Sequence, residues 1–195
     1  MKIKKILLAI ALSASLTAAH AASVSLVYTG ANDIDDDGAI LAAAGDTLTF
    51  DLVMDFTDQI TLGGGFDINW DSSVFALESY VSAGLGDPSF GRDPVLEDGR
   101  LFNGAVGNFN GLTEGLIATL SFQVLAFPAT MADGMITPSG TDGDSGPWID
   151  GVTFVDVIDD VEYNGLGIRV PVPAAVWFML SGLGVLAGMG RRRAS

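Results

Sequence analysis

Three aspartates at alternate positions, Asp33, Asp35 and Asp37, are followed directly by Gly38. This spacing is typical of the first half of a calcium loop, in which carboxylates converge on a hard cation and glycine makes the turn. The bidentate glutamate of a complete loop is missing, because its position is occupied by Ala44. Two interpretations follow: a site for Ca²⁺, or an acidic connection between strands that faces water.

Two further groups of carboxylates occur later in the chain, Asp142 with Asp144 and a run from Asp156 to Glu162. Paired carboxylates can hydrolyse glycosidic bonds, but spacing in the sequence does not give their separation in the fold. We expect solvated loops at both places. Trp148 lies between them and is a candidate glycan-binding platform; the alternative is an aromatic cap on the core.

The composition excludes several kinds of active site. The chain has no cysteine, and its one histidine and three lysines lie within the first 20 residues. Residues 22–169 therefore offer no His- or Cys-based triad, no lysine nucleophile and no His/Cys zinc site. The same segment carries all 24 acidic residues against three arginines, a net charge of −21 that repels nucleic acid. We expect a non-enzymatic protein that does not bind nucleic acid.

Alternation of apolar and polar residues predicts the strands that position these groups. From Thr47 to Phe56 every second residue is apolar, beginning at Leu48, and these residues should form one buried face. Gly115–Leu125 repeats the pattern, with inner positions at Leu116, Ala118, Leu120, Phe122 and Val124. Further strands are predicted at Ser23–Tyr28, Gly65–Trp70, Phe75–Val81, Val152–Ile158 and Glu162–Val170, with a tight turn or bulge at Gly63–Gly65. Many short strands without a helical period predict an all-β protein, with one antiparallel β-sandwich domain over residues 22–168.

Two segments of this body resemble cohesin-type domains. Phe66–Gly84 contains a strand, an aromatic–Asp pair, a turn, a second strand and a glycine, and Glu114–Val124 contains an acid–Gly pair before a long alternating strand. Together with the first strands, the similarity spans most of the body. It implies a jelly-roll sandwich, shared with carbohydrate-binding modules, that binds proteins or glycans without catalysis. No dockerin-contacting residues can be matched, so the resemblance implies the fold alone.

The first 21 residues are typical of a secretory signal peptide. Three lysines in the first five residues precede an apolar stretch from Ile6 to Ala18. Ala19 and Ala21 form a small-x-small cleavage signature, which predicts cleavage before Ala22. The alternative is an uncleaved anchor.

The last 27 residues, 169–195, predict a second address. Residues 174–190 are uncharged and, as a helix, would measure about 26 Å, which is at the short limit for spanning a bilayer. Arg191, Arg192 and Arg193 follow and predict a cytoplasmic end, while Trp177 suits the outer interface. A single transmembrane helix with the sandwich outside is therefore expected. The alternative is a buried C-terminal core helix.

This tail resembles the PEP-CTERM sorting signal in its VPLPA-type variant. The residues that carry the resemblance are Val170, Pro171, Val172, Pro173, Ala174, Ala175 and Trp177, with the arginine cluster. Val172 departs from the Leu that is usual in the variant. The resemblance implies a Gram-negative bacterium that makes exopolysaccharide and an exosortase-type membrane enzyme that recognises and cleaves the tail.

Two functions remain open from the sequence. The first is an exported, non-enzymatic protein of the cell surface or extracellular matrix, held in the inner membrane until an exosortase processes it. The second keeps this route but makes the sandwich a binding module for a protein or for a carbohydrate such as exopolysaccharide.

Overall fold

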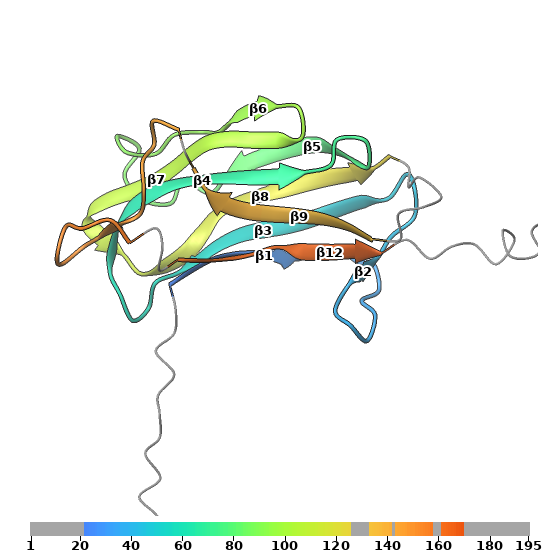
Figure 1. Cartoon of the computed structure of the whole chain (residues 1–195), viewed down its shortest axis with the longest axis horizontal. Coiled ribbons are helices and arrows are strands. Elements are labelled where there is room, and N and C mark those ends of the chain that lie inside the picture. Colours follow the sequence, from blue (N-terminus) through green and yellow to red (C-terminus); the bar gives the residue numbers. More distant parts are fainter. Residues whose placement is uncertain (1–21, 126–132, 142, 158–160, 170–195) are drawn as a thin grey trace, which may run out of the picture.

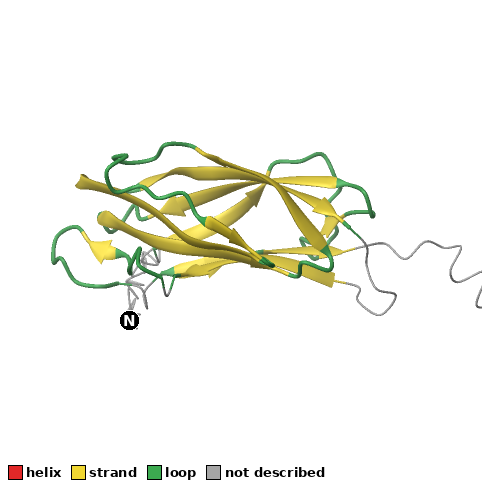
Figure 2. Ribbon diagram, turned by 90° about the horizontal axis from the view of Figure 1, so that it is seen from above, coloured by secondary structure: helices red, strands yellow, loops and turns green. Residues whose placement is uncertain are grey.

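The structure is a computed structural model that describes residues 22–125, 133–141, 143–157 and 161–169, and all regular elements in these ranges are β-strands. They are β1 (Ser23–Tyr28), β2 (Ile40–Leu41), β3 (Thr47–Asp55), β4 (Thr61–Trp70), β5 (Phe75–Ser82), β6 (Val95–Glu97), β7 (Arg100–Leu112), β8 (Glu114–Val124), β9 (Asp133–Gly140), β10 (Ile149–Asp150), β11 (Glu162–Asn164) and β12 (Leu166–Arg169) (Figure 1). One sheet has the order β11-β1-β3-β8-β5; the other has the order β2-β12-β9-β4-β7-β6, with β10 beside β4. The sheets lie face to face (Figure 2), which confirms the predicted all-β sandwich.

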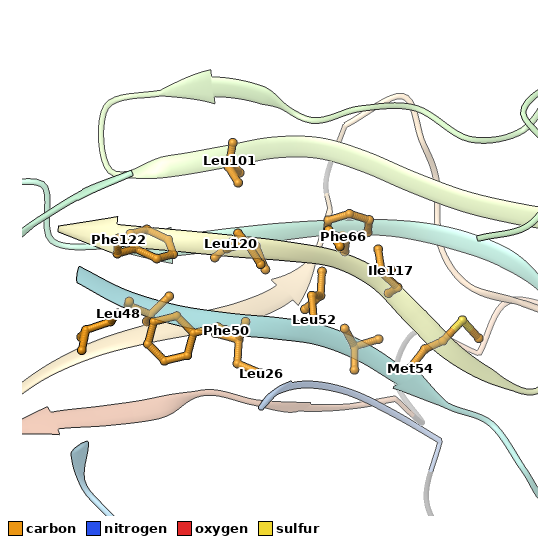
Figure 3. Packing of buried hydrophobic residues seen from close by; sticks show 14 of the residues in the cluster. Leu26, Leu48, Phe50, Leu52, Met54, Phe66, Leu101, Ile117, Leu120 and Phe122 are labelled. Carbon is orange, nitrogen blue, oxygen red and sulfur yellow. The ribbon is translucent and has the colours of Figure 1, made fainter. Parts of the chain in front are cut away.

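The core lies between the two sheets and is centred on β3. All five alternating apolar residues of the Thr47–Phe56 run are buried, as predicted. β3 pairs with β1 on one side and with β8 on the other, so Leu26, Phe50 and Leu120 lie in one layer of side chains (Figure 3). Burying each large apolar side chain contributes about 1.5–3 kcal/mol, and this layer therefore fixes which face of each strand points inward.

The predicted inner face of β8 is wrong at one position. Leu116 is 38% exposed, whereas Ile117 is buried. The pairing with β3 explains the difference, because Leu52 lies opposite Ala118 while Val53 lies opposite Leu116. Ile117 is thus an additional residue that reverses the alternation, as a β-bulge does. The four later inner positions are confirmed.

Most neighbouring strands are antiparallel, but each of the last two strands in the described residues forms one parallel pair. β11 runs parallel to β1, and β12 runs parallel to β2. The predicted single strand Glu162–Val170 is therefore two strands, which belong to different sheets and are separated by Gly165. A Cβ at Gly165 would lie 2.7 Å from the carbonyl oxygen of Ile136, so the step between the sheets requires a glycine.

The predicted strand Val152–Ile158 is wrong over its described residues, 152–157. Residues 151–153 form a turn, and only Asp156 makes an isolated bridge, to Ile149. The Asp150 carboxylate accepts hydrogen bonds from the backbone N–H groups of Val152 (2.9 Å) and Thr153. These bonds take the place of the backbone hydrogen bonds that a strand would make here.

The glycine run Gly63–Gly65 lies inside β4 rather than before it. The register between β4 and β7 shifts between Thr61 and Gly63, which places the predicted irregularity within the strand. Gly63 has a φ of 125°, and a Cβ there would lie 2.2 Å from the carbonyl oxygen of Val106. Only glycine permits this close approach of two backbones.

Candidate docking groove

The aspartates of the predicted calcium loop lie between β1 and β2. Among the described residues, no group of three or more His, Cys, Asp or Glu side chains is placed to hold a metal ion. Asp33, Asp35 and Asp37 therefore do not form such a group. Asp35 accepts hydrogen bonds from the backbone N–H groups of Asp37 (3.0 Å) and Ala39 (2.9 Å) and pairs with Arg169. The Ala39 N–H, followed by Asp37 and Arg169, lowers the pKa of Asp35. The loop thus holds the end of β12, and calcium binding stays a prediction.

Trp148 does not provide an exposed sugar platform. Its side chain is fully buried, and its ring packs on Phe56 with the centroids 4.8 Å apart and an interplanar angle of 31°. A Cβ at Gly64 would lie 2.6 Å from the Trp148 ring, so a glycine in β4 makes room for the indole. The platform interpretation is therefore wrong for this structure, and the alternative of an aromatic cap on the core is right.

The described members of the two later acidic groups are exposed on different segments of the chain. Asp144 and Asp156 lie outside the named strands, as expected for solvated loops, whereas Glu162 is the first residue of β11. Their sequence neighbours Asp142, Asp159 and Asp160 lie outside the described residues.

Both predicted addresses also lie outside the described residues, namely the signal cleavage site at Ala19 and Ala21 and the sorting tail from Val170 onward. Ala22, which would become the new N-terminus, is buried directly before β1. In the described ranges the structure has no helix long and apolar enough to cross a membrane.

The outer face of the larger sheet carries a groove over β4 and β7. Phe66 of β4 is buried between the sheets, so the alternate residues around it face outward. Gly63 lies opposite Gly107, and Ala105 follows on the same face of β7. These three residues give the groove a floor that has almost no side chains. Its volume is about 230 Å³.

Two phenylalanines form one wall of this groove. The Phe90 and Phe109 rings meet edge to face, with the centroids 4.3 Å apart and an interplanar angle of 80°. They remain 41% and 75% exposed. Edge-to-face packing stabilises such a pair by about 0.5–1.5 kcal/mol beyond burial. The pair is therefore held in place while it presents an apolar surface to solvent.

The segment that carries Phe90 is fastened to the free edge of β7. Asp87 donates its N–H to the carbonyl of Gly107 (2.8 Å), and Arg92 exchanges two backbone hydrogen bonds with Ala105, both 2.9 Å. The Asp87 carboxylate accepts the Ser89 N–H (2.8 Å), and this contact, followed by the Ser89 side chain, lowers the pKa of Asp87. Phe90 is thus positioned by backbone bonds on both sides.

The opposite wall comes from Ser145 and Pro147 of the loop before β10 and from Ile149 of β10 itself. Asn103 of β7 fastens this loop. Its side-chain oxygen accepts the Ser145 N–H (2.8 Å), and its carbonyl accepts the Ser145 hydroxyl (3.0 Å). Asn103 has a φ of 63°, a left-handed conformation in which Asn is enriched among non-glycine residues. The groove is therefore formed before any ligand arrives.

A turn with exposed apolar side chains follows Ile149. Val152, Phe154 and Val155 are 73%, 70% and 58% exposed. The Asp150 carboxylate accepts hydrogen bonds from Thr153, Gln59 and Val152, and these bonds lower its pKa far below the usual range. The turn is a second pre-ordered apolar surface next to the strand that forms the groove wall.

The groove combines an apolar wall with a backbone floor. The hydroxyl of Ser145, on the opposite wall, is engaged by the Asn103 carbonyl. Sequence analysis missed the groove, because Gly63–Gly65 predicted only a turn or bulge and the Arg100–Leu112 segment predicted no strand. The available signal was Phe109 between two asparagines, an aromatic residue without the alternating pattern of a buried strand.

Comparison with solved structures then identifies the architecture. CaCohA2 of Clostridium acetobutylicum matches with a TM-score of 0.52 and 17% identity over 76% of this chain and 90% of that one. The body has a cohesin-like fold. The sixth cohesin of scaffoldin B from Acetivibrio cellulolyticus, solved with the Cel5 dockerin, gives 0.50 and 15% over 76% and 99%. The seventh ScaB type I cohesin of Pseudobacteroides cellulosolvens gives 0.50 and 12% over 78% and 94%.

Searches by sequence find no such likeness. No protein-family profile matches the chain, and no curated protein matches it significantly. The resemblance of Phe66–Gly84 and Glu114–Val124 to cohesin-type domains is confirmed at the level of the fold. Within this cohesin-like sandwich, the groove lies on the outer face of the larger sheet, in the part that contains β9, β4, β7 and β6.

Proposed function

We propose that this protein is an exported, non-enzymatic binding module whose cohesin-like sandwich docks a protein partner. The observation that carries the proposal is the pre-formed groove with the exposed Phe90–Phe109 pair. Aromatic residues are enriched where interfaces gain most of their binding energy. A solved cohesin of the same fold was determined with a dockerin bound, which supports a protein as the ligand.

Replacing Phe109 with serine is expected to weaken this docking by about 2 kcal/mol or more, a loss of roughly 30-fold, as for an interface hot spot. The unfolding free energy should fall by no more than about 1.5 kcal/mol, because the side chain is 75% exposed and its edge-to-face contact with Phe90 is the main interaction lost. The measurement is saturable binding of the tagged full chain to a single component of the producing organism's extracellular proteins.

The matched control for this experiment is Val81→Ser, since Val81 is 61% exposed on β5 of the other sheet. Docking through the groove predicts unchanged binding for this variant. Two results would reject the groove as the docking surface: equal losses of binding affinity in both variants, or a Phe109→Ser variant that binds as tightly as the native chain.

For the route to the surface, we propose export through the signal peptide of residues 1–21 and sorting through residues 169–195 by an exosortase-type enzyme. Pro171 and Pro173 would keep the motif extended, residues 174–190 would place it in the inner membrane, and Arg191–Arg193 would fix its orientation. The support is the order of these features in the sequence. The destination is the cell surface or extracellular matrix.

The intact mass of the surface-exposed protein tests this route. We expect a mass that lacks residues 1–21 and also the tail beyond the motif near Val170–Ala175. A mass that retains the tail would mean a permanent anchor and would refute processing, whereas the docking groove would be unaffected.

A further inference from the structure

A second cavity opens at the side of the sandwich, between β5 and the segment that runs along β7. Tyr80 and Ser82 of β5 lie opposite Leu120 and Ala118 of β8, both fully buried, so all four side chains point between the sheets. Among the described residues β5 is an edge strand of its sheet, with β8 as its only strand neighbour. The cavity has a volume of about 220 Å³. We call it the edge cavity.

Polar groups of opposite character meet in the edge cavity. Tyr80 and Ser82 line it from one sheet, and Arg92 and Asp93 line it from the segment along β7. Burial raises the pKa of Tyr80 to about 12, with a further contribution from the negative charge of Asp93, whereas a hydrogen bond with the Ser82 side chain acts in the opposite direction. The phenol therefore stays protonated. Leu85 adds an apolar surface.

Arg92 is available to a ligand in a way that the other arginines of the sandwich are not. Arg100 pairs with Asp67, and Arg169 pairs with Asp35 and Asp37. Arg92 is exposed, and its guanidinium makes no ion pair or side-chain hydrogen bond with the residues that the structure describes. Its backbone is fixed by the two hydrogen bonds to Ala105.

From these groups we infer that the edge cavity binds a neutral sugar ring. Sugar hydroxyls both donate and accept, which matches a cavity with a cation, a carboxylate and two hydroxyl groups. A pyranose ring also has apolar C–H groups for Leu85 and the Tyr80 ring. The volume is below the roughly 300–1,000 Å³ typical of drug-sized ligands, so one ring fits better than a larger molecule.

Charge selects against other small ligands. Arg92 and Asp93 together carry no net charge, while residues 22–169 as a whole carry −21, so anionic sugars meet a repulsive field. A free amino acid would rely on two ion pairs, and Arg92 and Asp93 are both exposed, where ion pairs contribute only about 0–1 kcal/mol. A neutral sugar binds through hydrogen bonds and needs no ion pair with Arg92 or Asp93.

Isothermal titration of the full chain with methyl glycosides of glucose, galactose and mannose tests the inference. At least one glycoside should bind, and both Asp93→Asn and Arg92→Gln should weaken it at least tenfold with an unchanged melting temperature. Asp36→Asn, in the exposed connection between β1 and β2, should bind the glycoside as the native chain does. Glucuronate should bind at least tenfold more weakly than the best neutral glycoside.

Three results would overturn the sugar site. They are no binding of any glycoside, binding by the Asp93→Asn and Arg92→Gln variants that is as tight as that of the native chain, or binding of glycine and alanine in place of sugars. The inference does not rest on protein docking. Phe109→Ser should lose the protein partner and keep the glycoside, so failure of either proposal is recognised separately.

Discussion

Replacing Trp148 with alanine is expected to lower the free energy of unfolding by about 3–5 kcal/mol. The indole is fully buried, stacks on Phe56 and lies against Gly64, so its removal leaves a cavity at the end of the core. Chemical denaturation of the full chain, followed by Tyr and Trp fluorescence, measures this. Because this loss is comparable to the whole stability of many domains, a loss of ligand binding in this variant would report unfolding.

Trp148→Phe is the matched control, since it keeps a ring in contact with Phe56. We expect it to recover more than half of the lost stability. If Trp148→Ala remained as stable as the native chain while it lost a bound glycan, the indole would be a surface platform after all, and the description of the core would be wrong.

The second large effect is expected at Asp67, a carboxylate that is only 1% exposed. It pairs with Arg100 and accepts the backbone N–H of Asn103 at 2.7 Å. Asp67→Ala leaves both donors without this acceptor and is expected to cost about 3 kcal/mol, the lower end for a broken buried pair, because Arg100 keeps 30% exposure. Thermal and denaturant unfolding provide the measurement.

An exposed aspartate serves as the control for this substitution. Asp36→Asn, in the connection between β1 and β2, should change stability by less than about 0.5 kcal/mol. Asn103 also fastens the loop that forms one groove wall, so Asp67→Ala should weaken docking as well as stability. An Asp67→Ala variant as stable as Asp36→Asn would contradict the buried pair.

Strands with one buried and one solvated face could be predicted from the sequence. β1 begins and ends where expected. Four of the five predicted inward residues lie in β3 and the fifth, Phe56, follows directly and is also buried, because alternation directly reports a half-buried strand. The bulge at Ile117 could not be predicted, since an extra residue leaves no mark among the three consecutive apolar residues Leu116, Ile117 and Ala118.

β7 was not predicted, although it is the longest strand in the described residues. Its inward positions include Gly104, where a Cβ would meet the Phe66 ring at 2.6 Å, and its outward positions include Gly107. Glycine supplies no side chain for an alternating pattern and usually weakens a strand. Here, glycines make room for aromatic rings from the neighbouring strand and for the groove.

The groove and the edge cavity depend on pairings between distant segments, which is why neither could be predicted. Phe90 and Phe109 are 19 positions apart, and their contact depends on the hydrogen bonds that fasten residues 87–92 to β7. Trp148, by contrast, was a reasonable candidate in a polar, Gly/Pro-rich stretch. Its burial depends on the space that Gly64 leaves for the indole, and the sequence does not show that these two residues are in contact.

Site-specific photo-cross-linking in the producing cells tests the central claim most directly. A benzophenone amino acid placed at Phe109 should form one discrete cross-linked protein product, and the same group at Val81, exposed on the other sheet, should form none. Docking through the groove predicts this difference between the two positions. A discrete product from Val81, with none from Phe109 in a correctly folded chain, would contradict it.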